Sequence, residues 1–244
     1  VLENEDIDFL AAPSLYDERY DGQSGSYMQM VESILAHDKA VIVENDTRTS
    51  AWNNQSTELL TREEMGPTYN VSDTLSQLER DFANQLTRGV GQWFYNMWGT
   101  WFKHQQYSDL IEIMHNERVV NQARKTEYQS DICYIIDEDM YTYMAYGDFN
   151  ANYDVLYWLL YEQRCELARI GVSVDMYCMS DLEKGLIPDY KIYIMLSPIE
   201  MDESERAAAE KHLKNDNKTI VWQYISGASD GREISAKNMS DMID

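Results

Sequence analysis

The chain has 244 residues, which suits one large domain or two small ones. Apolar residues make up 44% of it, with 18 Tyr and 6 Trp, so a packed core is expected and wholesale disorder is excluded. It carries 43 acidic and 20 basic residues, a formal charge of −23, which disfavours nucleic acid and anionic membrane surfaces as partners. Most of this acidity is expected to serve solubility.

Neither a membrane span nor a metal or disulfide framework is expected. The longest strongly apolar run, residues 155–161, is far shorter than the ~20 residues that cross a bilayer. No basic-then-apolar leader is visible; because the chain begins at Val1 inside a loop-strand pattern, we interpret it as a processed or excised piece, with the cytoplasm as the favoured compartment. Its three Cys form no CxxC pair, and Cys133 and Cys178 are expected to be buried and inert. No cofactor is expected.

The first half of the chain alternates short apolar runs with helical patterns, which is typical of βα units. A strand is predicted at 7–12, a polar loop at 16–26, and a helix at 28–37. The run AVIVE at 40–44 reads as a strand buried on both faces. The long polar segment 45–69 is interpreted as a loop over a site.

Two more helices and one strand complete this half. Ser72 or Asp73 is predicted to cap a helix that ends at Gly89, and a strand follows at 90–97. A second helix is predicted at 107–125, with an inward face of four residues: Leu110, Ile113, Met114 and Val120.

A second α/β series begins near residue 130. Strands are predicted at 131–136, 172–178, 190–196 and 218–224, and helices at 152–169 and from Asp202 to about 214. With right-handed crossovers this order predicts a flavodoxin-like three-layer sandwich. No closing helix is expected before Asp244, which suggests that this unit is cut short.

Searches for common catalytic motifs find little. GxxxxGK[ST], HExxH and GxSxG are absent, the four His are not at ligand spacing, and Phe94 stands where a GxGxxG phrase starting at Gly89 needs glycine. His104, beside the aromatic segment that ends the strand at 90–97, is kept as a candidate site residue. The alternative is an exposed loop histidine.

One pattern carries chemistry. Glu44 ends a buried strand and is followed by Asp46 and Arg48. Ligand sites in parallel α/β folds lie at the carboxyl ends of the strands, so a carboxylate there can act as nucleophile or base, and Arg48 could hold it ionised. The alternative is an ion pair that only fixes the loop.

Aromatic residues gather at the end of the next strand, namely Trp93, Trp98, Trp101 and Phe102. A sugar packs its C–H face on such rings while its hydroxyls reach charged acceptors. The alternative is an aromatic core or a subunit interface. A retaining glycosidase needs two carboxyls ~5–5.5 Å apart. Only Glu44 stands at a suitable strand end, so its partner would come from elsewhere.

Several phrases in this order resemble glycoside hydrolase family 42, the beta-galactosidase family, and its close relatives: DIDFLAAPSLYDERY, KAVIVENDTRTS, LERDFANQLTRGVGQWFYNMWGTWF, LARIGVSVDMYCMSDL, PDYKIYIMLSPIEMD and KTIVWQYISG. The resemblance implies that residues 1–127 are the last three strand–helix units of a (β/α)8 TIM barrel. Residues 128–244 then resemble the amidotransferase-like trimerisation domain of that family, possessing its fold without a Gly-x-Cys-x-Gly elbow.

The family's members are retaining enzymes, and Glu44 falls on their nucleophile position, while the acid/base position lies upstream of Val1. Trp93, Trp98 and Trp101 fall in the region that lines the sugar pocket. The phrase NDTRT after Glu44 is closer to divergent relatives than to typical enzymes. The second domain implies a homo-oligomer in which it partly closes a neighbour's active site.

The function expected from these residues is therefore a fragment of a retaining exo-glycosidase, with a carbohydrate substrate and Glu44 as nucleophile. Two alternatives stay open. One is a non-catalytic carbohydrate-binding or oligomer-assembly module. The other is a flavodoxin-like nucleotide binder, which is disfavoured because Asp137, Glu138 and Asp139 would repel phosphate.

Overall fold

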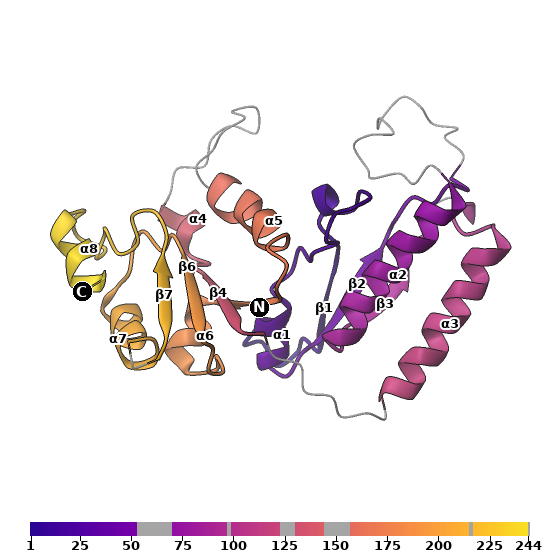
Figure 1. Ribbon diagram of the computed structural model, residues 1–244. Coiled ribbons are helices and arrows are strands. Elements are labelled where there is room, and N and C mark those ends of the chain that lie inside the picture. Colours follow the sequence, from indigo (N-terminus) through magenta and orange to yellow (C-terminus); the bar gives the residue numbers. More distant parts are fainter. Residues whose placement is uncertain (53–69, 97–98, 123–129, 144–156, 215–216, 244) are drawn as a thin grey trace. The chain divides into compact units, whose positions relative to one another are not determined.

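The chain folds as a mixed α/β protein with two parallel sheets, each in its own compact unit (Figure 1). The computed structural model describes residues 1–52, 70–96, 99–122, 130–143, 157–214 and 217–243. The first unit comprises Val1–Gln29 and Asp38–Tyr128, and the second comprises Met30–His37 and Gln129–Asp244. In the described ranges, none of the helices has the length and apolarity to traverse a bilayer.

The first unit holds a three-stranded parallel sheet of order β1-β2-β3, formed by β1 (Phe9–Pro13), β2 (Ala40–Asn45) and β3 (Gly91–Phe94). A 3-10 turn (Tyr16–Glu18) follows β1. Pro13, Glu44 and Trp93 pair across the three strands. The carboxyl ends of all three strands therefore meet at one edge of the sheet.

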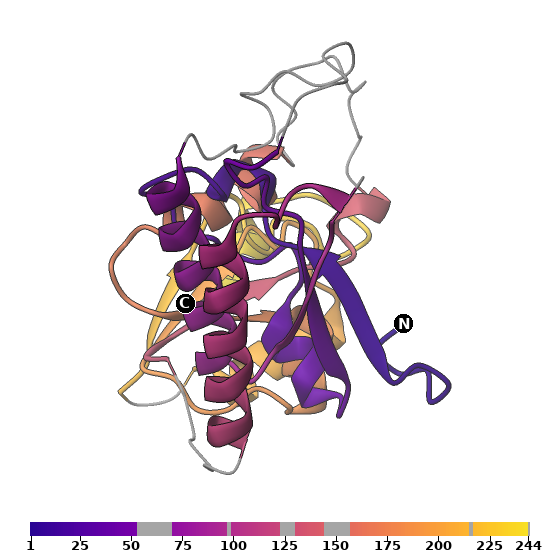
Figure 2. The same ribbon diagram turned by 90° about the vertical axis from the view of Figure 1, so that its right-hand side faces the viewer.

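Two long helices, α2 (Val71–Thr87) and α3 (Gln105–Gln122), run side by side in this unit (Figures 1 and 2). Their shared core is Leu78, Leu110 and Met114, against which Phe94 and Phe102 pack. The cap of α2 differs from the prediction: the side chain of Asn70, rather than Ser72 or Asp73, accepts the Asp73 N–H at 2.9 Å.

The inward face of α3 is narrower than predicted. Leu110 and Met114 are buried, whereas Ile113 and Val120 are 57% and 49% exposed. Both lie about a quarter-turn or more around the helix from the stripe that contains Leu110 and Met114, so they miss the core.

The second unit holds four parallel strands in the order β5-β4-β6-β7. They are β4 (Ile132–Ile136), β5 (Val174–Cys178), β6 (Ile192–Leu196) and β7 (Thr219–Trp222). The central strand β4 is buried at every position, as its unbroken apolar run predicts for a strand covered on both faces. Its alternate residues feed two separate cores.

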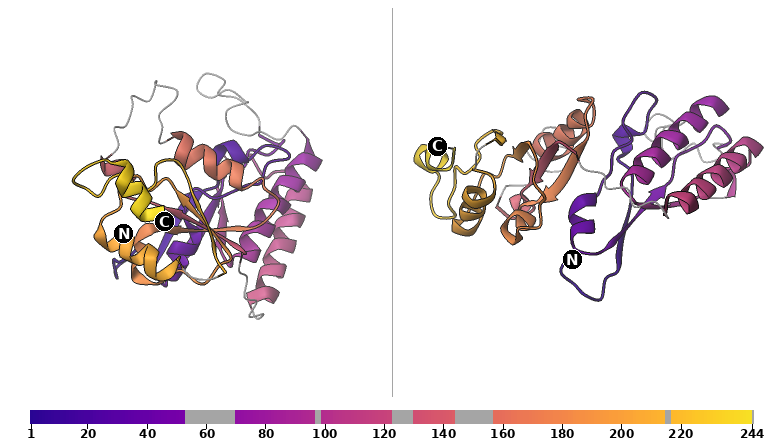
Figure 3. Two further views of the ribbon diagram at one scale, coloured as in Figure 1. Left: turned by 60° about the vertical axis from the view of Figure 1, so that its left-hand side comes forward. Right: turned by 60° about the horizontal axis from the view of Figure 1, so that its bottom comes forward.

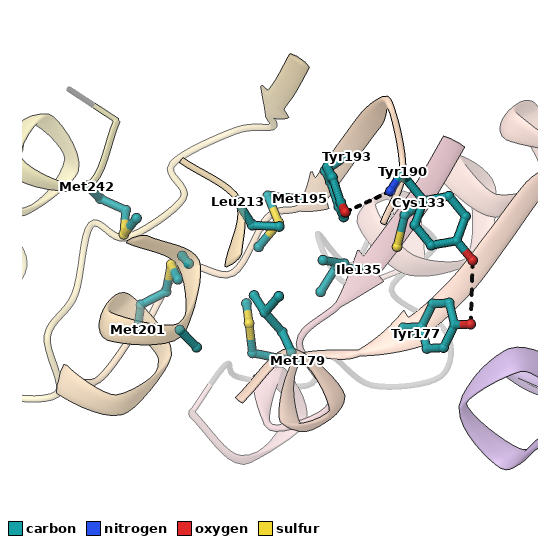
Figure 4. Packing of buried hydrophobic residues seen from close by; sticks show 13 residues of the cluster. Cys133, Ile135, Tyr177, Met179, Tyr190, Tyr193, Met195, Met201, Leu213 and Met242 are labelled. Atoms are coloured by element: carbon teal, nitrogen blue, oxygen red, sulfur yellow. Dashed lines mark hydrogen bonds between the residues drawn. The ribbon is translucent and has the colours of Figure 1, made fainter. Parts of the chain in front are cut away.

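One of these cores contains Cys133, Ile135 and Met195, and the other contains Tyr134, Ile136 and Leu196. In the first, Tyr190 links its neighbours: its backbone N–H donates to the Tyr193 hydroxyl at 2.9 Å. Its own hydroxyl donates to the Asp175 carboxylate at 2.8 Å and lies 3.4 Å from the Tyr177 hydroxyl (Figure 4). Buried hydroxyls are thus paired within an otherwise apolar layer.

The helices of the second unit are α4 (Met140–Tyr143), a π-helical segment (Tyr157–Glu162) leading into α5 (Gln163–Leu167), α6 (Met179–Lys184), α7 (Glu203–His212) and α8 (Ala236–Ile243). Asp202 caps α7 as predicted, accepting the N–H groups of Ser204 and Glu205. The expectation of no closing helix is wrong, because α8 is the last element of the described chain (Figure 3). Its Met242 packs into the core (Figure 4).

Helix α1 (Val31–Ala36) belongs to the second unit, although a continuous first domain 1–127 is expected from the sequence. Its side chains satisfy the outer edge of β5, an end strand of the sheet. Glu32 accepts the Met176 N–H at 2.9 Å and Ser33 Oγ accepts the Cys178 N–H at 2.8 Å. These bonds cover N–H groups that an edge strand would otherwise leave open.

Candidate functional site

Glu44 and Trp93 lie on the same face of the first sheet. They are register partners on adjacent parallel strands, and such pairs project side chains to one side. Glu44 is half-buried and Trp93 is 43% exposed. The carboxyl end of the sheet therefore presents a carboxylate beside an accessible indole.

The face that carries this pair is open in the described part of the chain. Phe9 is 53% exposed, and Ala11 and Ala40 on the same face are exposed as well. On the opposite face Val41 and Val43 are buried. The prediction that the run AVIVE is buried on both faces is therefore wrong for this chain, because only one face of β2 is covered.

Asp46, two residues beyond Glu44, forms an ion pair with Arg19. Arg19 is 1% exposed, its Nη2 donates to the carbonyl of Ser14 at 2.9 Å, and its guanidinium lies 4.0 Å from the centre of the Tyr16 ring. Arg19 is not among the site residues predicted from the sequence. Its place in the loop after a predicted strand could have indicated it, because that loop starts at the same sheet edge as Glu44.

Arg48 is placed differently from the expectation that it holds Glu44 ionised. It is 4% exposed, and its guanidinium lies 5.0 Å from the Trp52 ring and 5.5 Å from the Trp101 ring. Such cation–π contacts favour a buried guanidinium. The cation that acts on Glu44 is Arg19, whose charge lowers the pKa of that carboxyl.

Three influences act on the pKa of Glu44, and they do not all have the same sign. Burial raises its pKa above the ordinary value and the negative charge of Asp46 raises it further, while Arg19 lowers it. Burial also raises the pKa of Asp46, and Arg19 again opposes that shift. The buried guanidinium of Arg19 thus lowers the pKa of both carboxyls, and Arg48 adds to its effect on Asp46.

The aromatic residues divide between this edge and the interior. Tyr95 links the two groups, with ring centroids 5.6 Å from Trp93 and 6.0 Å from Trp101, both edge to face. Trp101 is only 1% exposed, and the Thr49 hydroxyl donates to its carbonyl. In the described structure Trp93 is therefore the more accessible indole, and Trp101 packs beneath the surface.

Phe102 and His104 make their contacts on the helical side of this unit. Phe102 packs edge to face on Phe94 at 5.3 Å within the helix core. His104 is exposed; its ring lies 5.3 Å from Tyr107 and its Nδ1 accepts the Gln106 N–H at 3.3 Å, which satisfies a donor at the start of α3. Trp98 lies outside the described residues. Within those residues, no group of three metal-ligating side chains occurs.

Comparisons with known proteins show a similarity in fold to solved structures. No family model matches the sequence, and neither does a curated protein. Among solved structures, the chain is similar to a catalytic mutant of Gan42B, a GH42 beta-galactosidase from G. stearothermophilus, with a TM-score of 0.54 and 11% identity. It is likewise similar to Gan42B itself, with a TM-score of 0.50 and 12% identity.

Both matches cover 84% of this chain and 30% of the other. At this identity the likeness shows the fold alone, and the chain spans about 30% of the length of the structures it matches. A distant structural similarity to part of the Gan42B structures follows from these matches.

Proposed function

We propose that this chain is part of a retaining exo-glycosidase of the beta-galactosidase type, with Glu44 as the nucleophile. The observation that carries the proposal is the pairing of Glu44 with the half-exposed Trp93 at the carboxyl ends of parallel strands. The acid/base glutamate would lie outside residues 1–244.

The topology of each unit supports this proposal. In the first unit, β2 and β3 are parallel neighbours followed by α2 and α3, as in successive units of a (β/α)8 barrel. In the second unit, the strand order β5-β4-β6-β7 corresponds to the first four strands of a flavodoxin-like sheet. We propose that the first unit is the C-terminal part of a barrel and the second a trimerisation-type domain.

In the proposed reaction the Glu44 carboxylate attacks the anomeric carbon of a terminal beta-glycoside. A bond from Glu44 to that carbon forms as the glycosidic bond breaks, and the leaving oxygen takes a proton from the acid. The acid/base residue then deprotonates a water molecule, which attacks the anomeric carbon and breaks its bond to Glu44. Trp93 would pack on the C–H face of the sugar.

Covalent trapping tests Glu44 directly. The reagent is 2,4-dinitrophenyl 2-deoxy-2-fluoro-beta-galactoside, whose leaving group needs no proton, and the sample is the longest natural polypeptide that contains this chain. We expect peptide mass spectrometry to find one fluorosugar on Glu44. Glu44→Gln should abolish the adduct, while the exposed Glu79→Gln in the same unit should retain it. Equal labelling of Glu44→Gln would remove Glu44 from the mechanism.

A second candidate is a non-catalytic carbohydrate-binding or oligomer-assembly module. The exposed indole of Trp93 favours it, because stacking on a sugar needs no second carboxyl. In that case galactose should bind without turnover in calorimetric titrations. Trp93→Ala should weaken binding about tenfold, and Glu44→Gln should weaken it only slightly.

We also propose that the protein is a homo-oligomer with contacts through the second unit. Light scattering of the same polypeptide tests this proposal. A monomeric mass at micromolar concentration would contradict it.

A further inference from the structure

We infer that Arg19 is a positioning residue for Glu44: it neutralises Asp46 and ties the ends of β1 and β2 together, so that Glu44 remains charged beside Asp46. This inference rests on the proposed role of Glu44. It concerns a residue in a different loop, whose guanidinium pairs with Asp46 rather than serving as nucleophile or acid.

The geometry fixes the guanidinium of Arg19 from three sides. It forms an ion pair with Asp46 beyond β2, donates to the Ser14 carbonyl beyond β1 at 2.9 Å, and lies 4.0 Å from the centre of the Tyr16 ring. It is 1% exposed. Because water hardly reaches the pair, solvent screens it much less than a surface ion pair.

The loop that carries Arg19 is itself closed by hydrogen bonds. The Leu15 N–H donates to the Ser26 carbonyl at 2.9 Å. The side chain of Glu18, which is fully buried, accepts the Ser24 hydroxyl at 2.6 Å and the Ser24 N–H at 3.1 Å. These bonds fix the backbone of the loop around Arg19.

Several charged or titratable groups lie around this guanidinium, and they come from the end of β1, the end of β2 and helix α2. The acidic ones are Glu44 and Asp46 at the end of β2 and Asp81 on α2, and the others are Arg48 after β2, Tyr16 after β1 and Arg80 on α2. Asp81 has its own partner, since Arg80 Nη2 lies 2.8 Å from its Oδ1. Asp46 forms its ion pair with Arg19, and Arg48 lowers its pKa as well. The charges of Arg19 and Asp46 both act on Glu44.

Removing either member of the ion pair should shift the ionisation of Glu44 in opposite directions. Arg19→Gln removes the positive charge that acts on Glu44 and leaves Asp46 without its ion-pair partner, so the pKa of Glu44 should rise. Asp46→Asn removes a repelling charge, so the pKa of Glu44 should fall. If Arg19 only stabilised the loop, the two substitutions would not shift the pKa of Glu44 in opposite directions, because both would loosen the same contact.

The experiment measures the Glu44 pKa by carbon-13 NMR on protein labelled at the glutamate side-chain carboxyl, with Glu44→Gln identifying the resonance. It also measures the pH dependence of trapping by the fluorosugar. We expect a shift of about one pH unit upward in Arg19→Gln, or a tenfold change in the ratio of the two protonation states at a given pH. The double variant Arg19→Gln/Asp46→Asn should return towards the unsubstituted protein, and Arg19→Lys should keep the pKa.

Shifts of the same sign in Arg19→Gln and Asp46→Asn, or no shift in either, would overturn the inference. If Arg19→Gln does not fold, Asp46→Asn and Arg19→Lys still decide it, since the first must lower the pKa and the second must leave it unchanged. Absence of any adduct on Glu44 would contradict the proposed function, whereas the NMR titration would still decide the role of Arg19.

Discussion

Glu44 on β2 and Trp93 on β3 are register partners in a parallel sheet, and their side chains share the open face of that sheet. Asp46, on the same strand end, turns instead to the buried Arg19. At the end of β2, the Glu44 carboxylate thus lies on the open face of the sheet, while the Asp46 carboxylate is paired with Arg19. A carboxylate nucleophile beside a second carboxylate needs such pairing to stay ionised.

Trp93 and Trp101 should respond differently to truncation. Trp93 is 43% exposed and Trp101 is 1% exposed. Trp101→Ala should cost about 3–5 kcal/mol of unfolding free energy because it empties a buried site. Trp93→Ala should change stability by only about 0.5 kcal/mol but weaken sugar binding about tenfold. Urea unfolding and calorimetric titration with galactose measure the two effects, and similar stability losses in both variants would contradict the assignment.

Asp137 should make the second unit less stable as the pH rises. It is 1% exposed, and burial raises its pKa to about 6 although the Tyr143 hydroxyl donates to it. The native state therefore binds this proton more tightly than the unfolded state, in which an Asp has a pKa of about 4. Stability is full below that value and declines by on the order of 2 kcal/mol as the pH rises through about 6.

Urea unfolding of the second unit at about pH 4.5 and pH 7.5 measures this decline. Asp137→Asn should reduce it, because the amide carries no charge and its oxygen can still accept the Tyr143 hydroxyl. The exposed Glu210→Gln serves as the control, because Glu210 is not among the charges that shift the pKa of Asp137. Glu205, whose pKa burial raises to about 7, contributes with the same sign, so part of the decline should survive in Asp137→Asn.

Asp181 should anchor helix α1 on the second unit. It is fully buried, accepts the hydroxyl of Ser33, and lies 2.7 Å from Nε2 of His37. Asp181→Ala leaves these donors without their acceptor, which should cost about 1–3 kcal/mol for each buried donor left unsatisfied.

Hydrogen exchange distinguishes this anchor from a general loss of stability. In Asp181→Ala, amides of α1 should lose protection before those of the central strand β4. The exposed Glu183→Ala on the same helix, α6, is the matched control. Uniform loss of protection across the second unit would argue against a local anchor.

The three thiols should be unreactive in the folded protein. Cys133, Cys165 and Cys178 are all buried and free of disulfides. Burial raises the pKa of Cys178 to about 12 and that of Cys133 well above its ordinary value, so little thiolate forms at neutral pH. A colorimetric thiol reagent should react slowly without urea and rapidly, with all three, in urea. Fast reaction of one thiol in the folded state would contradict its burial.

Local sequence patterns determined most of the secondary structure. Short continuous apolar runs mark β2 and β4, the period-3.6 spacing of apolar residues marks α2, and Asp202 marks the start of α7, because these signals arise within a few residues of one another. The same signals failed where contacts with other elements decide. Ile113 and Val120 are apolar yet exposed, and α8 forms because Met242 packs into a core built by distant strands.

The candidate site shows the same division. The position of Glu44 at a strand end, and the presence of indoles near the next strand end, follow from the sequence by itself, because strand patterns and the parallel order of βα units are local properties. Only the tertiary structure decided which side chains meet. It pairs Asp46 with Arg19, places Arg48 over Trp52 and Trp101, and assigns α1 to the second unit. Such pairings join residues from separate loops, and sequence spacing carries no information on distances between them.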